Sequence, residues 1–542
     1  MNTIYAKDFG VQPGKLNILN MQNLLNFLQG DDLEKQVLFE KGDYVVDAVS
    51  LPTEEVHITN TAGVKEFSKG EKAFQNRAPL WFKNVKNTVV DLNGARFVAN
   101  GKASNMIIQN CENLTVRGGV FTANEPDMHC LRVIKVHRFS VDFSTRSNFY
   151  TVGTYVHVRG KDYDYNLIKK YRTAWHIAKI GAKTPNTVVR THELFSTAIS
   201  AKVLEKGVIR ITYPNTTKFH VGDRFYAFDN RREYVGIFVD RSKNVTVDNL
   251  EQNFNYSLAY VAQDSENLKI TNCRFAPEKK NGRLMASVAD FVQICMCKGH
   301  VLIENNLFEG AGDDCLNAHG IHFKIGKIIN NTVTVHFKHA QTHGFNPISA
   351  GDEIVFVRPV NLLPTGSARV IKSTLLDDNN IELELSTTKG ANADFVIEDV
   401  TKIPSVTFRN NTVNRIITRG VLVTVRNKVL IENNHFISNS MSGILLSDDA
   451  KSWFESGPCR DVIIKGNTFD YCGKTPILIW PENSVADDTI HRNIKIVGNK
   501  FNDYKGEVMR LKCAENVLIE GNKFAKSENI KQKDCKNVVI KQ

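Results

Sequence analysis

The segment EGAGDDCLNAHGIHFK (309–324) contains residue types that could act chemically on a substrate. Asp313 and Asp314 are adjacent in it, and Asn317 and His319 follow within an otherwise apolar stretch. Neighbouring residues of a strand face opposite sides, so one of two adjacent acids would ordinarily point into an apolar interior. Because a buried charge is costly, an acid pair at this place needs a compensating role. We therefore take these residues as the centre of a candidate catalytic site.

Asp290, in SVADFVQIC, lies 23 residues before Asp313, which is one coil of the solenoid predicted below. We expect it to stack beside the acid pair. Three clustered carboxylates suit acid/base chemistry on a glycosidic bond, because like charges hold one acid protonated while another stays ionised to activate water. Where a water fits between acid and base, hydrolysis inverts the anomeric configuration. Two alternatives for these acids are an Asx turn and a Ca²⁺ site of the kind that polysaccharide lyases use.

A second group of polar residues could bind a sugar. TRGVLVT (418–424) places Arg419 at a strand start, and SGILLSDDAKSWFESGP (442–458) carries four candidate ligands: Asp448, Asp449, Trp453 and Glu455. An aromatic ring stacks on a pyranose, while charged groups bind its hydroxyls. In HFKHAQTHGF (336–345) three His surround Gln341, and no carboxylate or Cys at ligand spacing favours a metal. These segments predict a sugar site with Gln341 at its rim; the alternative is a solvated loop anchored by its Trp.

An internal repeat, Asn-apolar-x-Ile/Val-x-x-Asn-x-Phe, must position these residues. Its copies include HVLIENNLF (300–308), KVLIENNHF (428–436), DVIIKGNTF (461–469) and NVLIEGNKF (516–524). Each copy alternates with period two, so one face of every strand is buried. The repeated Asn recur at 23 to 33 residues, which predicts a right-handed parallel β-helix, an all-β fold, with coils ~4.8 Å apart. The Asn are expected to stack as a ladder and the Phe as an internal stack. A leucine-rich solenoid is disfavoured because the LxxLxL pattern is absent.

Two strand-rich regions lack this repeat, and each contains a Gly-Asp turn before a strand, VGDRFYAFD (221–229) and AGDEIVFV (350–357). Such elements are typical of small β-barrels or sandwiches inserted into the solenoid. The expected divisions are an N-terminal cap with the first coils (1–145), a first β insert (146–230), central coils with the acidic site (231–320), a second β-barrel insert (321–400) and C-terminal coils (401–542). We expect the helical segment near the start to cap the solenoid, and the second insert to close one side of the sugar pocket.

Composition excludes several classes of function. The 542 residues include 69 Lys and Arg and 58 Asp and Glu, a net charge of +11. No dense basic run accompanies this charge, so no nucleic-acid partner is expected. The sequence contains no stretch of about 18 apolar residues, so no membrane-spanning segment is expected. The ten Cys are scattered without metal-ligand spacing, so no metal site is expected among them.

Several long motifs resemble glycoside hydrolase family 110, the exo-acting α-1,3-galactosidases. They are RLMASVADFVQIC…GHVLIENNLFEGAGDDCLNAHG, HFKHAQTHGFNPISAGDE, TRGVLVTVRNKVLIENNHF and MSGILLSDDAKSWFESGP. The similarity is densest across residues 230–500. It implies a β-helix with β-barrel inserts that removes terminal α-linked galactose with inversion and without a cofactor, from blood-group B-type or linear Galα1-3Gal glycans. By the same resemblance, Asp290, Asp313 and Asp314 match the family's acidic site. We take Asp290 as the acid and the other two as sharing the water.

The resemblance also implies a partner and a compartment. The partner is an oligosaccharide or glycan with terminal α-galactose, and the basic surface and the inserts permit a homodimer. Many family members are exported, which favours a periplasmic or secreted protein whose signal peptide has been removed. The alternative is a cytoplasmic location, because MNTIYAKDFGVQPGK shows neither an apolar segment nor a cleavage signature.

Two other classes of protein share parts of this pattern. The motif GDDC also resembles polygalacturonases, a class of β-helix polysaccharide hydrolases that place one Asp a coil ahead of an Asp pair. Those enzymes then require a Gly-His-Gly and an Arg-x-Lys, whereas here QTHGF lies in an insert and Arg510-Leu511-Lys512 comes too late. A non-catalytic carbohydrate-binding solenoid, such as an adhesin or tailspike, would need no coupled acids. The register of Asp290 against the acid pair separates that class from an enzyme.

Overall fold

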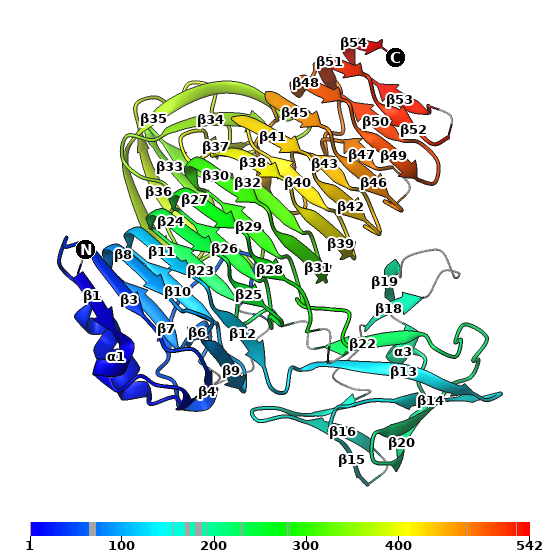
Figure 1. Ribbon diagram of the computed structural model, residues 1–542. Helices are drawn as coiled ribbons and strands as arrows, with labels where there is room; N and C mark the ends of the chain where they lie inside the picture. Colours follow the sequence, from blue (N-terminus) through cyan, green and yellow to red (C-terminus); the bar gives the residue numbers. More distant parts are fainter. Residues whose placement is uncertain are drawn as a thin grey trace.

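The computed structural model describes residues 2–541 except 64, 66–71, 154, 168–173, 179–186, 192, 229–230, 279, 281, 474 and 527. Its body is a parallel β-helix of three long sheets (Figure 1). One sheet runs from β1 (Asn2–Tyr5) to β54 (Lys536–Lys541), and a second from β2 (Gly14–Lys15) to β52 (Lys523–Phe524). The third runs from β7 (Leu80–Lys83) to β53 (Ile530–Lys533). The prediction of an all-β parallel β-helix is confirmed.

The third sheet positions the candidate site, and its strands are short and strictly parallel along the helix. In spatial order its central members are β23 (Ile237–Asp240), β26 (Tyr260–Gln263), β29 (Val292–Cys295), β32 (Leu316–Ile329), β40 (Val421–Thr424) and β43 (Ile444–Leu446). Val292, Ile294 and Leu316 belong to the interior core. Since strand residues alternate, Gln293 and Asn317 face outward. At this level of the outer face, the polar Gln293 and Asn317 therefore lie between the apolar Val261 of β26 and Leu422 of β40.

A ladder of asparagine side chains runs through the interior. The amide of Asn434 donates to the Oδ1 of Asn467 at 2.9 Å, and that of Asn467 to Asn499 at 3.0 Å. The residue just before each ladder position adopts a left-handed backbone, with φ of 55° at Asn433 and 66° at Gly466. Asn and Gly tolerate this conformation best. The predicted ladder is confirmed, and each Asn-Asn or Gly-Asn pair divides two tasks: the first residue turns the chain and the second stacks.

Phenylalanine rings form the second internal ladder. Phe436 and Phe469 stack with centroids 5.1 Å apart, and Phe469 and Phe501 with centroids 4.8 Å apart. Tyr44 and Phe97 continue the same kind of stacking near the N-terminal end. The predicted aromatic stack is confirmed, and it fills the solenoid corner with the same ring at successive coils.

The N-terminal end of the solenoid is covered by α1 (Ile18–Phe27), as expected for a terminal unit (Figure 1). Asn17 caps the helix by accepting from the amide of Asn20 at 3.2 Å. Met21, Leu24 and Leu25 are buried in the core of the first coils. No helix among the described residues is long and apolar enough to cross a membrane.

The first insert projects from the β-helix as an antiparallel sheet in the order β19-β18-β22-β13-β14-β21-β20. Its outer strands are β18 (Ala174–Ala178), β19 (Thr187–Thr191) and β20 (Ser200–Glu205). Its central strands are β13 (Met128–Val136), β14 (Ser140–Ser144), β21 (Val208–Thr212) and β22 (Arg224–Phe228). A small sheet of β15 (Phe149–Val152), β16 (Tyr155–Arg159) and β17 (Asp164–Asn166) shares its apolar core. The insert sheet thus starts at Met128, ahead of the expected boundary at residue 146, and residues 229–230 at its expected end lie outside the described residues.

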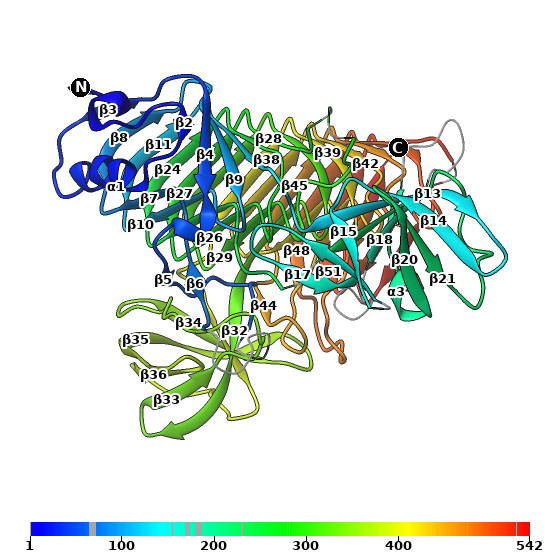
Figure 2. The same ribbon diagram turned by 90° about the horizontal axis from the view of Figure 1, so that it is seen from below.

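The second insert is a closed antiparallel barrel. Its ring is β32, β33 (Thr332–His336), β36 (Asn380–Leu385), β35 (Leu363–Asp377), β34 (Glu353–Arg358) and β37 (Val396–Asp399), which pairs back with β32. β32 is 14 residues long. Its first residues pair with β29 in the β-helix and its last residues belong to the barrel. One continuous strand therefore joins the barrel to the candidate site (Figure 2).

Candidate active site

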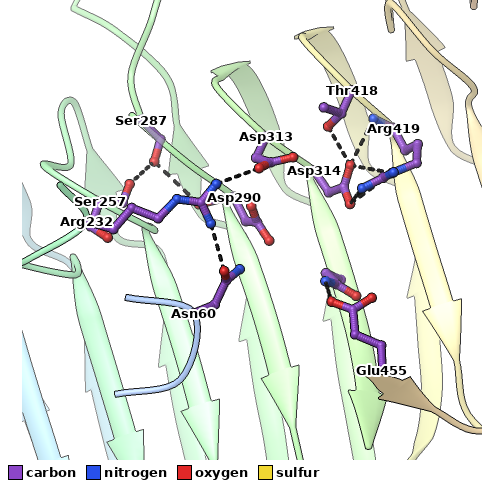
Figure 3. A network of polar contacts seen from close by, with 11 residues as sticks. Asn60, Arg232, Ser257, Ser287, Asp290, Asp313, Asp314, Thr418, Arg419 and Glu455 are labelled. Atoms are coloured by element: carbon purple, nitrogen blue, oxygen red, sulfur yellow. Dashed lines mark hydrogen bonds and ion pairs between the residues drawn. The ribbon is translucent and has the colours of Figure 1, made fainter. Parts of the chain in front are cut away.

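The three acids lie where the chain enters β29 and β32. Val292 pairs with Leu316, an offset of 24 residues that places Asp290 level with Asp314, whereas the sequence spacing suggested Asp313. The amide of Phe291 donates to the carbonyl oxygen of Asp314 at 2.9 Å, in agreement with that register. Asp313 therefore lies one residue ahead of the pair. Figure 3 shows all three carboxylates in one cluster.

Asp314 is fixed by the next coil. Val421 of β40 pairs with Leu316, so Arg419 lies level with Asp314 on the neighbouring strand. The Nε of Arg419 donates to both carboxylate oxygens at 2.8 and 3.0 Å, its Nη2 donates at 2.6 Å, and Thr418 adds a hydroxyl donor. Asp314 is 1% exposed. Burial raises the pKa of Asp314, and Arg419 opposes that rise.

Asp313 is held from the opposite direction by Arg232. The Nη2 of Arg232 lies 2.6 Å from the Oδ2 of Asp313, and its Nη1 donates to Asn60 at 2.8 Å. Arg232 follows the last strand of the first insert, and Asn60 belongs to a loop of the N-terminal region. Three separate parts of the chain thus meet at one carboxylate (Figure 3).

Asp290 differs from its two neighbours because no arginine holds it at ion-pair distance among the described residues. Its side chain is buried, and its Oδ1 has no hydrogen-bond partner there. Burial, with the carboxylates of Asp313 and Asp314, raises the pKa of Asp290 well above its ordinary value. Burial and neighbouring like charges favour the protonated form of an acid. The cluster therefore combines an acid whose surroundings favour the proton with two acids that each have an arginine partner.

Glu455 extends the acid cluster along the outer face of the sheet. It lies on β44 (Glu455–Ser456), which pairs with β32 and places Glu455 opposite Ile321. The amide of Asn317 donates to the Oε1 of Glu455 at 2.8 Å. The Nδ1 of His319 lies 2.8 Å from the carbonyl oxygen of Gly320, which can only accept. Its Nε2 lies 3.0 Å from the side-chain amide nitrogen of Gln293 and 3.8 Å from the Oε1 of Glu455.

A narrow pocket opens beside this cluster. Its floor includes Gln293 and His319, and its walls come from Asn60, from residues 337–339 of the barrel and from residues 453–455. The indole of Trp453 is half exposed and packs on the ring of His339 with centroids 4.8 Å apart. Burial, aided by the positive charge of Arg232, lowers the pKa of His339 to about 4. The pocket thus offers an aromatic wall, the imidazoles of His319 and His339, and the carboxylate of Glu455.

Two of the sequence-predicted ligands lie behind the pocket instead of in it. Asp448 has no exposed surface, and its Oδ1 lies 3.8 Å from the Nε2 of His322. Burial and the carboxylate of Glu398 raise the pKa of Asp448. Asp449 accepts from the backbone amides of Lys451, Ser452 and Trp453 at 2.7 to 3.0 Å. Asp448 therefore has no access to a sugar, and the contacts of Asp449 fix the loop that presents Trp453.

Gln341 lies in the barrel segment between β33 and β34, next to the pocket residue His339. It does not line the pocket, whereas Thr342 does. The hydroxyl of Thr342 contacts that of Thr59 at 3.1 Å, so the barrel segment closes against the N-terminal loop.

The sequence interpretation missed Arg232, Asn60 and Gln293. Arg232 and Asn60 lie 58 and 230 residues before Asp290 in the chain, outside any motif, so no local pattern marks them. Gln293 had a usable signal: with its paired residue Asn317 it interrupts a row across the sheet that is apolar on both sides, at Val261 of β26 and Leu422 of β40. A polar residue in that row indicates a surface turned toward a ligand.

Comparisons with known proteins agree with this architecture. The description "Right handed beta helix region" matches residues 396–542, and "GLAA-B beta-barrel domain II" matches residues 332–394. The second range falls within the closed barrel formed by β32 to β37.

Two of the relatives are similar over almost the whole chain, and a third over part of it. Alpha-1,3-galactosidase A of Bacteroides thetaiotaomicron is 30% identical over 525 residues, which cover 93% of this chain and 90% of that protein. Alpha-1,3-galactosidase A of Bacteroides fragilis strain YCH46 is 29% identical, covering 97% and 88%. The protein of the same name from Akkermansia muciniphila is 35% identical over 327 residues, covering 60% of this chain and 55% of that protein.

Proposed function

Since the chain belongs to glycoside hydrolase family 110, it is a glycoside hydrolase of α-galactosides, and we propose that it removes terminal α-1,3-linked galactose with inversion. The observation that supports this proposal is the acid cluster at the start of the two strands whose Gln293 and His319 line a small pocket. Asp313 and Asp314 each have an arginine partner, and Asp290 is buried without one among the described residues. Blood-group B-type glycans and linear Galα1-3Gal are the proposed substrates.

In the proposed reaction one carboxyl group donates its proton to the glycosidic oxygen as the bond from C1 breaks. An ionised carboxylate takes a proton from a water molecule, whose oxygen attacks C1 from the opposite face. The products are β-galactose and the free acceptor sugar, and the enzyme regains its starting charge when the two carboxyl groups exchange a proton with solvent. Arg232 and Arg419 stabilise the ionised partners throughout.

The surroundings of the three acids support one assignment of their roles. Asp290 is buried with no cation at ion-pair distance among the described residues, which supports Asp290 as the proton donor, as the sequence interpretation assumed. Asp313 carries an arginine partner, and its charge raises the pKa of both other acids, so it suits the role of a base. Kinetics of variants at each acid test this assignment.

We further propose that the enzyme takes single galactose units from chain ends. The pocket is lined by the N-terminal loop, the barrel and the Trp453 segment, and walls from three parts of the chain suit the end of a glycan better than its middle. The ring of Trp453 would stack on the galactose, and Glu455 with Asn317 would accept and donate hydrogen bonds to its hydroxyls.

An NMR time course with Galα1-3Gal and with the group B trisaccharide tests the proposal. We expect the β-anomer of galactose as the first product, before mutarotation, at the same rate with and without EDTA. The ratio of the two rates assigns the preferred substrate. Initial release of α-galactose would contradict inversion, and no release from either sugar would contradict the proposed activity.

A further inference from the structure

A large cleft lies between the β-helix and the first insert, separate from the pocket described above. It has a volume of about 880 Å³, within the range of ligand sites. β9 (Arg96–Asn100) and β12 (Val120–Ala123) supply one wall, and β13, β22 and the segment 144–148 supply the other. In Figure 1 the insert strands β13 and β22 extend from the β-helix beside β12.

The lining of this cleft is strongly basic. It includes seven Arg or Lys side chains against three acids, Asp43, Glu125 and Glu278, an excess of four positive charges. The protein as a whole has a net charge of +11, so one cleft holds a disproportionate part of it. A concave surface lined by one sign of charge concentrates ions of the opposite sign.

Internal ion pairs do not account for these cations. Arg96 takes up two of the acids, with Asp43 at 3.2 Å and Glu278 at 2.9 Å, and Arg159 pairs with Asp164 at 2.9 Å. Among the described residues, no carboxylate lies within ion-pair distance of Arg132, Arg224 or Arg283. Arg224 donates to the backbone carbonyl of Gly282 at 2.6 Å, which leaves its charge uncompensated.

Arg283 is partly buried, and its charged neighbours include Glu278 and Arg146. Burial lowers the pKa of Arg283, the like charge of Arg146 adds to this decrease, and the carboxylate of Glu278 opposes it. Glu278 is already paired with Arg96 at 2.9 Å and does not reach ion-pair distance of Arg283. A partly buried guanidinium group without a direct ion pair is costly, and a bound anion would offset that cost. Arg132 and Arg224 lie around the same Cys130 side chain, so three guanidinium groups converge on one place.

The remaining lining indicates which anion would fit. Ser144, Thr145, Ser147, Asn124 and Asn148 present hydroxyl and amide groups of the kind that bind sugar hydroxyls. Tyr163, the one aromatic residue in the lining, is 8% exposed, so the described part of the cleft has no platform on which nucleic-acid bases could stack. Guanidinium groups match the planar oxygens of carboxylates and also bind sulfate esters.

We infer that this cleft, centred on Arg132, Arg224 and Arg283, is a second saccharide-binding site that takes an anionic glycan bearing sulfate esters or carboxylates. It is independent of the catalytic proposal, because none of its lining residues belongs to the acid cluster. The segment from Gly282 to Asp290 connects the two sites along the chain.

Binding to the full-length protein tests this inference by isothermal titration calorimetry. The probes are a sulfated galactan, the same galactan after desulfation, and polygalacturonate. We expect at least one anionic polymer to bind at least tenfold more tightly than the desulfated galactan, with affinity falling as salt increases. The two anionic probes distinguish sulfate from carboxylate recognition. Equal or absent binding of all three polymers would overturn the inference.

Matched variants localise the site. R132Q/R283Q should weaken binding about tenfold, while R117Q/R409Q removes the same charge from exposed ion pairs on β11 (Glu112–Arg117) and β38 (Ser405–Arg409) and should leave binding unchanged. The single variant R132Q leaves the partly buried Arg283 in place, so weaker binding by R132Q cannot be attributed to misfolding around Arg283. Asp314→Asn should bind like the wild type, which separates this site from the catalytic one. Equal weakening by both double variants would show a diffuse charge effect and overturn the inference.

Discussion

Asp290, Asp313 and Asp314 have similar intrinsic acidity, and their surroundings make them different. Asp314 accepts four hydrogen bonds from Arg419 and one from Thr418, and Asp313 is paired with Arg232. Asp290 is buried without such a cation. Burial favours the neutral carboxyl group, while an adjacent guanidinium favours the carboxylate. One cluster can therefore supply both a proton donor and a base.

Substituting each acid by Asn in turn tests this division. We expect every variant to lose at least about 100-fold in kcat on a disaccharide, the scale of general acid/base catalysis. Only the variant lacking the proton donor should keep near-wild-type turnover of a nitrophenyl α-galactoside, whose leaving group needs no proton. The base variants should instead regain activity with azide. If all three variants behave alike on both substrates, the acids do not have separate roles.

Replacing Arg232 by Gln tests the electrostatic coupling. The positive charge of Arg232 lowers the pKa of Asp290 against the effects of burial and of the two neighbouring acids. Its removal should raise that pKa, so the limb of the kcat/KM profile that Asp290 controls should move to higher pH. Arg241→Gln, at an exposed arginine paired with Asp240, is the control. A profile that falls in height without moving along the pH axis would contradict the coupling.

β32 is the element on which the site depends, because it contributes Asn317 and His319 and then enters the barrel. Its position is fixed by parallel pairing with β29 and β40, and those strands are held in turn by the coils on each side. The asparagine ladder sets the turns that connect these coils. The precision of the site therefore rests on the regular stacking of elements that contact no substrate.

Asn467→Ala measures the contribution of the ladder. Asn467 is fully buried, accepts from the Asn434 backbone amide and donates to the carbonyl of Ile431. Alanine leaves these buried groups unpaired, so the free energy of unfolding should fall by about 2–4 kcal/mol. Asn502→Ala, at an exposed residue bonded to Asp470, should change it by less than about 0.5 kcal/mol. Equal melting temperatures for the two variants would contradict a stabilising ladder.

The complete chain consists of one β-helix with two inserts of different architecture, an antiparallel sheet and a closed barrel. The barrel returns to the β-helix at Asp399, the last residue of β37, close to the ion pair between Lys402 and Asp264. Burial and the neighbouring carboxylate of Asp352 raise the pKa of Asp399 to about 7. The junction between barrel and solenoid therefore titrates near neutral pH.

Asp399 should make stability depend on pH. Its folded-state pKa is above the unfolded value, so its contribution is complete below the unfolded pKa and is lost as the pH rises through about 7. The loss is at most about 4 kcal/mol. Between pH 5 and 8, the melting temperature should fall less steeply for Asp399→Asn than for the wild type. Asp394→Asn, at an exposed position, is the control and should behave like the wild type. Parallel melting curves for all three proteins would contradict this assignment.

Much of the architecture follows from local sequence alone. The alternating Asn…Asn-x-Phe repeat specifies short strands, left-handed turns and two side-chain ladders, because each coil reuses the same stereochemistry. GDDC and the Trp453 loop also indicated where polar chemistry would gather. The sequence did not show that Asp448 and Asp449 differ from residues that bind the sugar, because an exposed acid and a buried acid look identical in a sequence.

The tertiary structure alone decided how the site is completed. The offset of 24 residues between β29 and β32 aligned Asp290 with Asp314, and a one-residue change of register would have reversed which face each side chain occupies. Arg232 and Asn60 reach the acids from segments with no repeat and no motif. The repeat determines each coil through contacts between residues that are adjacent in the sequence and between side chains that stack on successive coils. The charge balance of the site depends on which distant segments the completed fold brings within 3 Å of a carboxylate, and no local pattern encodes that proximity.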